Sequence, residues 1–252
     1  MSNNNNIIIN TITIDFWDTI FVYPDIKDVL QHRVTFFYDI FLKYDKEILL
    51  EKTSDAVISI YSFFEEIWYG EKRTPSAEEM ILYTIDKVGL KDKVSRDDIV
   101  KLTKFNEEFI RKNEDIELIK DADIVIKKLF EKGYTLIIIS DTGFEPGTEL
   151  KKILIKHDLL KYFSYMIYSD EAGFSKPDKK AFQLALEKSS LNNKSVNFKN
   201  MIHIGDREDK DILGANSCGM QSILFAGTRD NDFDDSKATF RVKSWLEILD
   251  FF

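Results

Sequence analysis

Residues 7–19, with the sequence IIINTITIDFWDT, join a run of β-branched residues to a polar cluster that starts at Asp15. Such a run is typical of a buried strand, so we predict a strand over Ile7–Ile14 that ends at the aspartate. Three further apolar runs end in the same way, at Ser140–Thr142, Ser169–Lys176 and Gly205–Asp211. In one parallel sheet these strand ends share an edge, and open α/β sheets bind ligands there. The pattern therefore predicts that residues far apart in the chain meet at one site.

The chain after the first predicted strand has a different character. Between about residues 26 and 111, apolar residues recur every three or four positions, which predicts helices and no strand. Two residue pairs are typical of capped helix starts: Ser76 with Glu79, and Ser95 with Asp98. The segment therefore reads as an all-helical insertion.

Beyond residue 115, helices alternate with four predicted strands, at Tyr134–Ile139, Tyr165–Tyr168, Met201–Ile204 and Gln221–Phe225. This order implies right-handed βαβ units and a parallel sheet. We expect an α/β fold with a Rossmann-like parallel sheet core flanked by helices, formed by residues 1–22 and 115–252. Residues 23–114 would form an all-helical cap domain, inserted after the first strand, that stands over the sheet edge and selects the substrate.

The composition narrows the possible partners and compartments. The 252 residues suit one α/β domain with an insertion, and 44% hydrophobic with 31% charged residues is typical of a globular chain. A net charge of −9 argues against nucleic acid or an anionic membrane as the main partner. Cys218 is the only cysteine, so no intramolecular disulfide can form, and residues 1–14 lack the pattern of a signal peptide or membrane span. We therefore expect a cytoplasmic protein; its oligomeric state is not predicted.

Three aspartates that follow predicted strands, Asp15, Asp206 and Asp211, point to a metal site. Gathering three carboxylates without a cation is electrostatically costly, and a divalent ion with oxygen ligands removes that cost. Mg²⁺ suits a site with one or two carboxylates and a substrate phosphate. The alternative is that the acidic residues 206–211 merely begin a helix, where the helix dipole favours them. The Gly205 turn and the distant Asp15 favour the metal site.

Two further residues could handle phosphate. Lys176 precedes Pro177, whose ring fixes the local backbone, and Asp178 then suits a helix start. The Lys176 ammonium could link Asp15 to a phosphoryl oxygen and offset the charge of an attack between anions. Ser140 follows a run of isoleucines, and its hydroxyl and the next backbone N–H groups could hold phosphate. The plainer alternatives are a solvated lysine and a turn that ends a strand.

The order and identity of these residues resemble the haloacid dehalogenase (HAD) superfamily. Its first motif is similar to Asp15-Phe16-Trp17-Asp18-Thr19, and its second to Ser140. Its third motif is similar to SDEAGFSKP at residues 169–177, and its fourth to GDREDKD at residues 205–211, which continues as ILGAN. The helical insertion between the first and second motifs is similar to the cap of the superfamily's first subclass. The resemblance covers nearly the whole chain.

The resemblance implies an enzyme, a magnesium-dependent phosphohydrolase of a small phosphorylated metabolite. Asp15 would be the nucleophile that takes the phosphoryl group as an aspartyl-phosphate. Mg²⁺ would be held by the Asp15 carboxylate, the backbone carbonyl of Trp17 and Asp206, with Asp211 supporting or joining them. Thr19 would support the first loop. The transferring phosphate would be bound by Ser140, Asp141 and Lys176, of which Ser140 and Lys176 would also act in catalysis.

Trp17 departs from the phosphatase pattern of the family, in which this position is normally an aspartate that protonates the leaving group and then activates water. An indole offers only an N–H donor of negligible acidity, and loss of a general acid–base typically costs about 10²–10⁴-fold in rate. Asp18 would not replace it, because in an extended segment the next side chain points the other way. Asp141 also departs from the frequent asparagine and adds a negative charge near the phosphate.

Three hypotheses stay open. The first is a magnesium-dependent phosphohydrolase whose leaving groups need little protonation, such as acyl or aryl phosphates. The second is a catalytically weak relative that binds a phosphorylated ligand or partner through the retained site. The third is a metal-independent 2-haloacid dehalogenase, because dehalogenases of the family also carry a non-acidic aromatic residue at the position of Trp17. Their fourth motif, however, lacks the pair that stands here as Gly205-Asp206.

Overall fold

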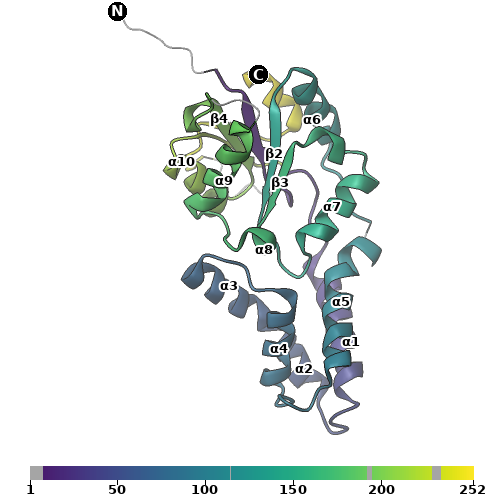
Figure 1. Ribbon diagram of the computed structural model, residues 1–252. Coiled ribbons are helices and arrows are strands. Elements are labelled where there is room, and N and C mark those ends of the chain that lie inside the picture. Colours follow the sequence, from purple (N-terminus) through teal and green to yellow (C-terminus); the bar gives the residue numbers. More distant parts are fainter. Residues whose placement is uncertain (1–7, 114, 192–194, 229–233) are drawn as a thin grey trace, which may run out of the picture. The chain divides into compact units, whose positions relative to one another are not determined.

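The computed structural model describes residues 8–113, 115–191, 195–228 and 234–252, and a six-stranded sheet forms its α/β part (Figure 1). All neighbouring strands are parallel, and their order across the sheet is β3-β2-β1-β4-β5-β6. Their bounds are Thr11–Ile14 (β1), Thr135–Ser140 (β2), Tyr165–Tyr168 (β3), Met201–Gly205 (β4), Gln221–Phe225 (β5) and Phe240–Val242 (β6). The predicted α/β class with a parallel sheet is confirmed.

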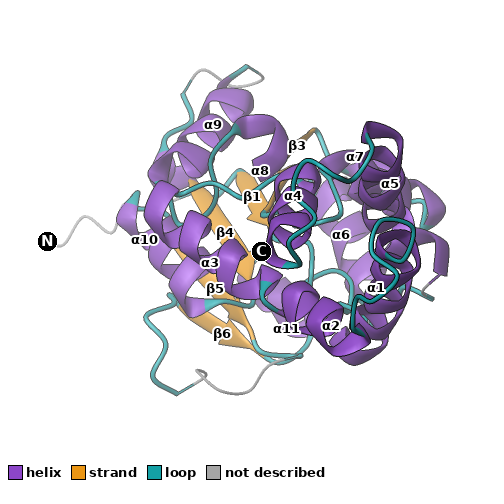
Figure 2. Ribbon diagram, turned by 90° about the horizontal axis from the view of Figure 1, so that it is seen from below, coloured by secondary structure: helices purple, strands orange, loops and turns teal. Residues whose placement is uncertain are grey.

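The strand order makes the sheet doubly wound. From β1 the chain steps outward to β2 and β3, and it then returns to the other side of β1 with β4, β5 and β6. Helices α9 (Lys179–Ser190) and α10 (Leu213–Ser217) cover one face, whereas α6 (Ala122–Glu131) and α11 (Trp245–Ile248) cover the other (Figure 2). The winding direction reverses between β1 and β4, and doubly wound sheets bind their ligands at that reversal.

The central strands consist of buried residues, many of them apolar, because both faces of the sheet are covered. All residues of β1 and β4 are buried, and Ile137 and Ile139 of β2 pack with Phe182 of α9 in one apolar cluster. The described strand β1 begins at Thr11, later than predicted, and Ile7 lies outside the described residues. β6 is not among the predicted strands, because three residues are too few for an alternating pattern to stand out.

A second compact unit comprises Tyr23–Ile116 and Thr142–Ile153, and the first comprises the described parts of Met1–Val22, Glu117–Asp141 and Leu154–Phe252. The helices of the second unit are α1 (Ile26–Phe41), α2 (Leu50–Ile58), α3 (Ile60–Glu71), α4 (Ala77–Lys87), α5 (Arg96–Asn113) and the first part of α7 (Gly147–Lys156). The predicted helical insertion between the first two strands is confirmed. The division into a core of residues 1–22 and 115–252 and a cap of residues 23–114 stays a prediction. None of the helices in the described ranges is long and apolar enough to span a bilayer.

A buried ion pair ties the segment Thr142–Ile153 to α1 within this helical unit. Arg33 Nη2 lies 2.7 Å from Glu145 Oε1, and both residues are buried. The ring of Phe144 lies under the guanidinium, 4.3 Å from its central carbon. Removal of one partner would leave a buried charge alone, which costs about 3–5 kcal/mol. The segment after Asp141 therefore belongs to the helical unit by its contacts, although it follows β2 in the sequence.

Both predicted capping pairs are present. Ser76 and Glu79 form a reciprocal capping box at the start of α4. At the start of α5, the Ser95 hydroxyl accepts the N–H of Asp98 at 3.2 Å. The Asp98 carboxylate itself accepts hydrogen bonds from the Tyr44 hydroxyl at 2.7 Å and from the Lys43 ammonium at 3.0 Å. Asp98 therefore links α5 to the chain that follows α1.

The hydrogen bond from Tyr44, with further ones from Lys43 and Lys101, lowers the pKa of Asp98 to about 2. The stability that this carboxylate contributes is present above the ordinary aspartate pKa near 4, and it is lost as the pH falls toward 2. We expect Asp98→Asn to lower the free energy of unfolding by about 1–2 kcal/mol at pH 7, and by less at pH 3. Urea unfolding at both pH values tests this, with the exposed Asp97→Asn as control. Equal losses at the two pH values would contradict it.

Candidate active site

A small cavity, of about 110 Å³, lies where the first, second and fourth strands end. Its lining comprises Asp15, Trp17, Asp18, Ser140, Asp141, Lys176, Asp206, Arg207, Lys210 and Asp211. All seven site residues predicted from the sequence are in this set. Asp18, Arg207 and Lys210 are additional. Arg207 and Lys210 lie inside the fourth motif, where basic residues between acidic ones are a signal that could have identified them.

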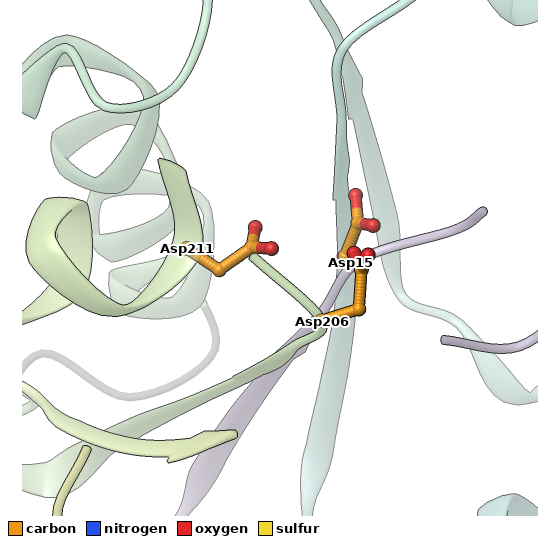
Figure 3. A group of neighbouring side chains, drawn as sticks. All are labelled: Asp15, Asp206 and Asp211. Carbon is orange, nitrogen blue, oxygen red and sulfur yellow. The ribbon is translucent and has the colours of Figure 1, made fainter. Parts of the chain in front are cut away.

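The pairing of β1 with β4 brings Asp15 and Asp206 together. Ile14 lies opposite Ile204, and the Asp15 N–H donates to the Ile204 carbonyl at 2.9 Å. Asp15 is thus one residue, and Asp206 two residues, beyond the same level of the sheet. One carboxylate oxygen from each of Asp15, Asp206 and Asp211 lies within 4.8 Å of the others (Figure 3). The convergence of the three aspartates that the sequence predicts is observed.

Asp211 reaches the site from the π-helical turn Glu208–Ile212, which follows β4. Its side chain packs directly on Gly205, where an alanine Cβ would lie only 2.6 Å from the Asp211 Cβ, so this position requires glycine. Asp211 Oδ1 accepts a hydrogen bond from Lys176 Nζ at 2.7 Å, and Oδ2 accepts the backbone N–H of Arg207 at 2.9 Å. The carboxylate is therefore held in one orientation.

Lys176 is 1% exposed, and its ammonium donates to the carboxylates of both Asp15 and Asp211. Its backbone is fixed from two sides. The Lys176 N–H donates to Asp141 Oδ1 at 2.9 Å. Two residues further on, the Asp178 side chain caps α9, as predicted. The lysine thus bridges the aspartate after β1 and the turn after β4.

A bound cation would stabilise the buried carboxylates of this cavity. Burial raises the pKa of Asp15 to about 7; Lys176 opposes this effect and Asp211 reinforces it. Burial also acts to raise the pKa of Asp211, but Lys176 and His203 outweigh it and hold that pKa below its usual range. The lining holds five carboxyl groups against three cationic side chains, an excess of two formal negative charges when all of them are ionised. One divalent cation would offset this excess.

The donor set fits a hard divalent ion. Mg²⁺ takes oxygen ligands at 2.0–2.1 Å in an octahedron, so neighbouring ligand oxygens lie about 3 Å apart and opposite ones about 4 Å apart. The three aspartate oxygens, all within 4.8 Å of one another, need only small side-chain adjustments to share one ion. Asp211 is better suited to support the site than to bind the ion directly, because both of its oxygens already accept N–H bonds.

The loop after β1 turns sharply at Asp18. The backbone there is left-handed, with φ 55°; the Asp18 N–H donates to the Phe21 carbonyl at 2.6 Å, and the Asp18 carbonyl accepts from the Thr228 hydroxyl at 2.8 Å. The extended geometry expected at Asp18 is therefore wrong, and this residue lines the cavity together with Asp15. A left-handed aspartate is uncommon and has no clear sequence signal, which explains the error.

Trp17 occupies the cavity wall in the same loop. It is half-buried, and its ring packs edge-on against Phe16 with 4.9 Å between the ring centroids. The carbonyl of the buried Thr19 accepts the indole N–H of Trp245 at 2.8 Å, which anchors the loop on α11. The loop of the first motif thus places an aromatic side chain at the position where the family resemblance predicts an acid.

The extra negative charge of Asp141 is offset within the site. Its Oδ1 accepts the backbone N–H of Lys176, and its Oδ2 lies 3.6 Å from Lys210 Nζ. Burial raises the pKa of Asp141, while Lys176 and Lys210 act in the opposite direction. Arg207, in contrast, pairs with Asp209 at 2.7 Å. Lys210 is the neighbour that sequence reasoning missed at this position.

Comparison with known proteins agrees with this arrangement. The haloacid dehalogenase-like hydrolase family matches residues 45–225, more than half of the chain. The glyceraldehyde 3-phosphate phosphatase of Pyrococcus abyssi is 35% identical over 101 residues, which are 40% of this chain and 39% of that protein. The ribulose-1,5-bisphosphate 5-phosphatase of Halopiger xanaduensis is 28% identical over 123 residues, 49% of this chain and 48% of that one. The matched region thus spans half or less of these relatives.

A solved structure extends the likeness over the whole fold. The 2-haloacid dehalogenase of Pseudomonas syringae pv. tomato DC3000 covers 96% of this chain and 97% of its own length, with a TM-score of 0.69 and 16% identity. At that identity the likeness concerns the fold alone. The family match over residues 45–225 includes Ser140 and the segments 169–177 and 205–211, and it begins after Asp15. The chain belongs to the haloacid dehalogenase-like hydrolase family.

Proposed function

We propose that this protein is a magnesium-dependent phosphohydrolase of a small phosphorylated metabolite, with Asp15 as the nucleophile. The observation that carries the proposal is the buried group of Asp15, Asp206 and Asp211, with one carboxylate oxygen from each within 4.8 Å of the others. Lys176 donates hydrogen bonds to Asp15 and Asp211. The relatives in Pyrococcus abyssi and Halopiger xanaduensis, which are phosphatases by name, support the substrate class. The helical insertion of residues 23–114 would be the cap domain that selects the substrate.

The proposed reaction has two steps on Asp15. In the first, an Asp15 carboxylate oxygen forms a bond to phosphorus while the bond to the leaving oxygen breaks, and that oxygen departs with the electron pair. In the second, water attacks the same phosphorus while the bond from the Asp15 oxygen to phosphorus breaks, inorganic phosphate leaves with the protons of the water, and the Asp15 carboxylate is restored. Lys176 would bind a phosphoryl oxygen and offset the negative charge that builds up between the anions, and Ser140 would hold another oxygen.

Asp15, Asp206 and the backbone carbonyl of Trp17 would hold the magnesium ion, with Asp211 in support. The bound ion would neutralise phosphoryl charge and keep the Asp15 carboxylate ionised despite its burial. Without the ion, ionisation of this carboxylate is disfavoured, because burial raises the pKa of Asp15 to about 7. Lys176 donates a hydrogen bond to the same carboxylate.

Trp17 limits which substrates the proposed enzyme can use. The half-buried indole lines the cavity but cannot protonate a leaving group. Substrates whose leaving oxygen is already a weak base, such as acyl and aryl phosphates, would therefore react best. The same observation supports the second candidate, a catalytically weak relative that retains ligand binding, because the missing acid–base costs about 10²–10⁴-fold in rate.

Removal of magnesium tests the proposal. We expect hydrolysis of acetyl phosphate and p-nitrophenyl phosphate to fall at least about tenfold with EDTA, to recover with added Mg²⁺, and to be lost in Asp206→Asn. Phosphate release is the measurement, and 2-chloropropionate in the same buffers is the comparison substrate. Halide release without metal would support a dehalogenase instead. Magnesium binding by calorimetry without turnover of either substrate class would support the weak, ligand-binding relative.

A further inference from the structure

A line of buried hydrogen bonds runs from the middle of the sheet to the candidate active site. It begins at Thr13 on β1 and His203 on β4, which are register partners and fully buried. Thr13 Oγ1 lies 2.8 Å from His203 Nδ1, and His203 Nε2 lies 3.1 Å from Asp211 Oδ1. Lys176 Nζ then joins Asp211 to Asp15. Both ring nitrogens of His203 therefore have a hydrogen-bond partner.

The chemistry of these groups assigns each donor and acceptor. A neutral imidazole has one N–H and one lone pair. An ionised carboxylate can only accept, so Nε2 must carry the proton and donate it to Asp211. Nδ1 then accepts from the Thr13 hydroxyl, whose other acceptor, the Ile202 carbonyl, is more distant at 3.4 Å.

The imidazole is also held by packing. The ring of Phe182 meets it edge-on, with an interplanar angle of 90° and 5.3 Å between the centroids. The ring therefore has one orientation in the plane that connects Thr13 with Asp211. A side chain in a merely apolar role would not need this alignment with two polar partners.

We propose that His203 is a positioning residue, which orients Asp211 and, through it, sets the Lys176 ammonium against Asp15. The proposal rests on the function proposed above and adds a residue that does not itself line the cavity. Three donors hold Asp211: the Lys176 ammonium, the Arg207 N–H and the His203 N–H. Of these, only the histidine comes from the buried interior of the sheet, so it fixes the carboxylate relative to β4. Partners that orient groups around a metal site in this way typically matter about 10–100-fold in affinity or activity.

Two variants distinguish orientation from simple packing. In His203→Gln the side-chain amide can place an N–H where the imidazole carries Nε2, whereas the shorter amide of His203→Asn reaches only the position of Nδ1. We expect His203→Asn to weaken Mg²⁺ affinity or lower kcat by about 10–100-fold, while His203→Gln stays within about threefold of the natural protein. Calorimetry and steady-state kinetics measure these values, and the melting temperature of each variant shows whether it folds. Equal losses in the two variants would overturn the proposal.

A spectroscopic measurement needs no variant. The ¹⁵N shifts of the imidazole nitrogens in the natural protein, with its three histidines, report which nitrogen carries the proton. We expect Nε2 of His203 to carry a proton, and an Nε2 without one would overturn the proposal. The position of the ring proton does not depend on turnover, so this test of His203 can fail without the proposed function failing. Failure of the proposed function would instead appear as natural protein that neither binds Mg²⁺ nor hydrolyses acetyl phosphate or p-nitrophenyl phosphate.

Discussion

Asp15→Asn is expected to lower kcat for acetyl phosphate and p-nitrophenyl phosphate by at least about 10³-fold, because an amide oxygen cannot carry the phosphoryl group as a carboxylate does. The nearby carboxylates of Asp206 and Asp211 are assigned above to holding or supporting the proposed metal ion. Asp15 is buried at the end of β1, in hydrogen-bond contact with Lys176 and within reach of the oxygens of Asp206 and Asp211. Steady-state phosphate release is the measurement.

Asp141→Asn is the matched control for this variant. It makes the same chemical change at another carboxylate of the cavity lining, one whose contacts are with the Lys176 backbone and Lys210. We expect Asp141→Asn to retain activity within about tenfold, because asparagine can still accept the Lys176 N–H. Mass spectrometry of acid-quenched natural protein should find phosphate on Asp15. Substantial turnover in Asp15→Asn, with the fold intact, would rule out this residue as the nucleophile.

Trp17→Asp is expected to raise kcat for alkyl phosphates, such as glycerol phosphate, by about 10–100-fold, because it supplies the general acid–base that the indole cannot. Acetyl phosphate should gain little, since its leaving oxygen needs little protonation. The substitution is feasible because Trp17 is only half-buried and its ring packs on that of the neighbouring Phe16. The slope of log kcat/KM against leaving-group pKa, measured over a series of phosphate esters, should become shallower in the variant.

Trp17→Asn controls for the loss of the indole. Asparagine has the size and polarity of aspartate but cannot donate or accept the catalytic proton. A gain in Trp17→Asp without a gain in Trp17→Asn would therefore assign the effect to proton transfer. Equal gains would mean that the indole only obstructs the cavity. An unchanged or lower rate in both folded variants would count against the missing acid as the limit on turnover.

The sheet and the meeting of the aspartates could be predicted because their signals are local and repeated. Each central strand is a short apolar run that ends in a polar cluster, and right-handed βαβ connections leave few ways to order such strands. Asp15 and Asp206 are each within two residues of a strand end. Their position along one edge therefore followed from the class of fold, without knowledge of any side-chain contact.

Other features depend on packing that a sequence pattern does not encode. The left-handed backbone at Asp18 is accompanied by hydrogen bonds to the Phe21 carbonyl and from the Thr228 hydroxyl. Thr228 is 210 residues away in the sequence, so no local pattern indicates this contact. The offset of Asp141 by Lys210 depends on a lysine far away in the chain and on the path of the turn after β4. The place of Thr142–Ile153 in the helical unit likewise depends on contacts between residues far apart in the sequence, such as the buried pair of Arg33 with Glu145.

The reversal of winding between β1 and β4 has a consequence for how this protein matures. A chain that has assembled only β1, β2 and β3 already holds Asp15 and Ser140, but it lacks Asp206, which follows β4. In such a partly formed sheet, the proposed nucleophile Asp15 would lack the second carboxylate of the proposed metal site, Asp206. Hydrolytic competence would arise only when β4 docks beside β1, so the onset of activity during refolding would mark the closing of the sheet's two halves.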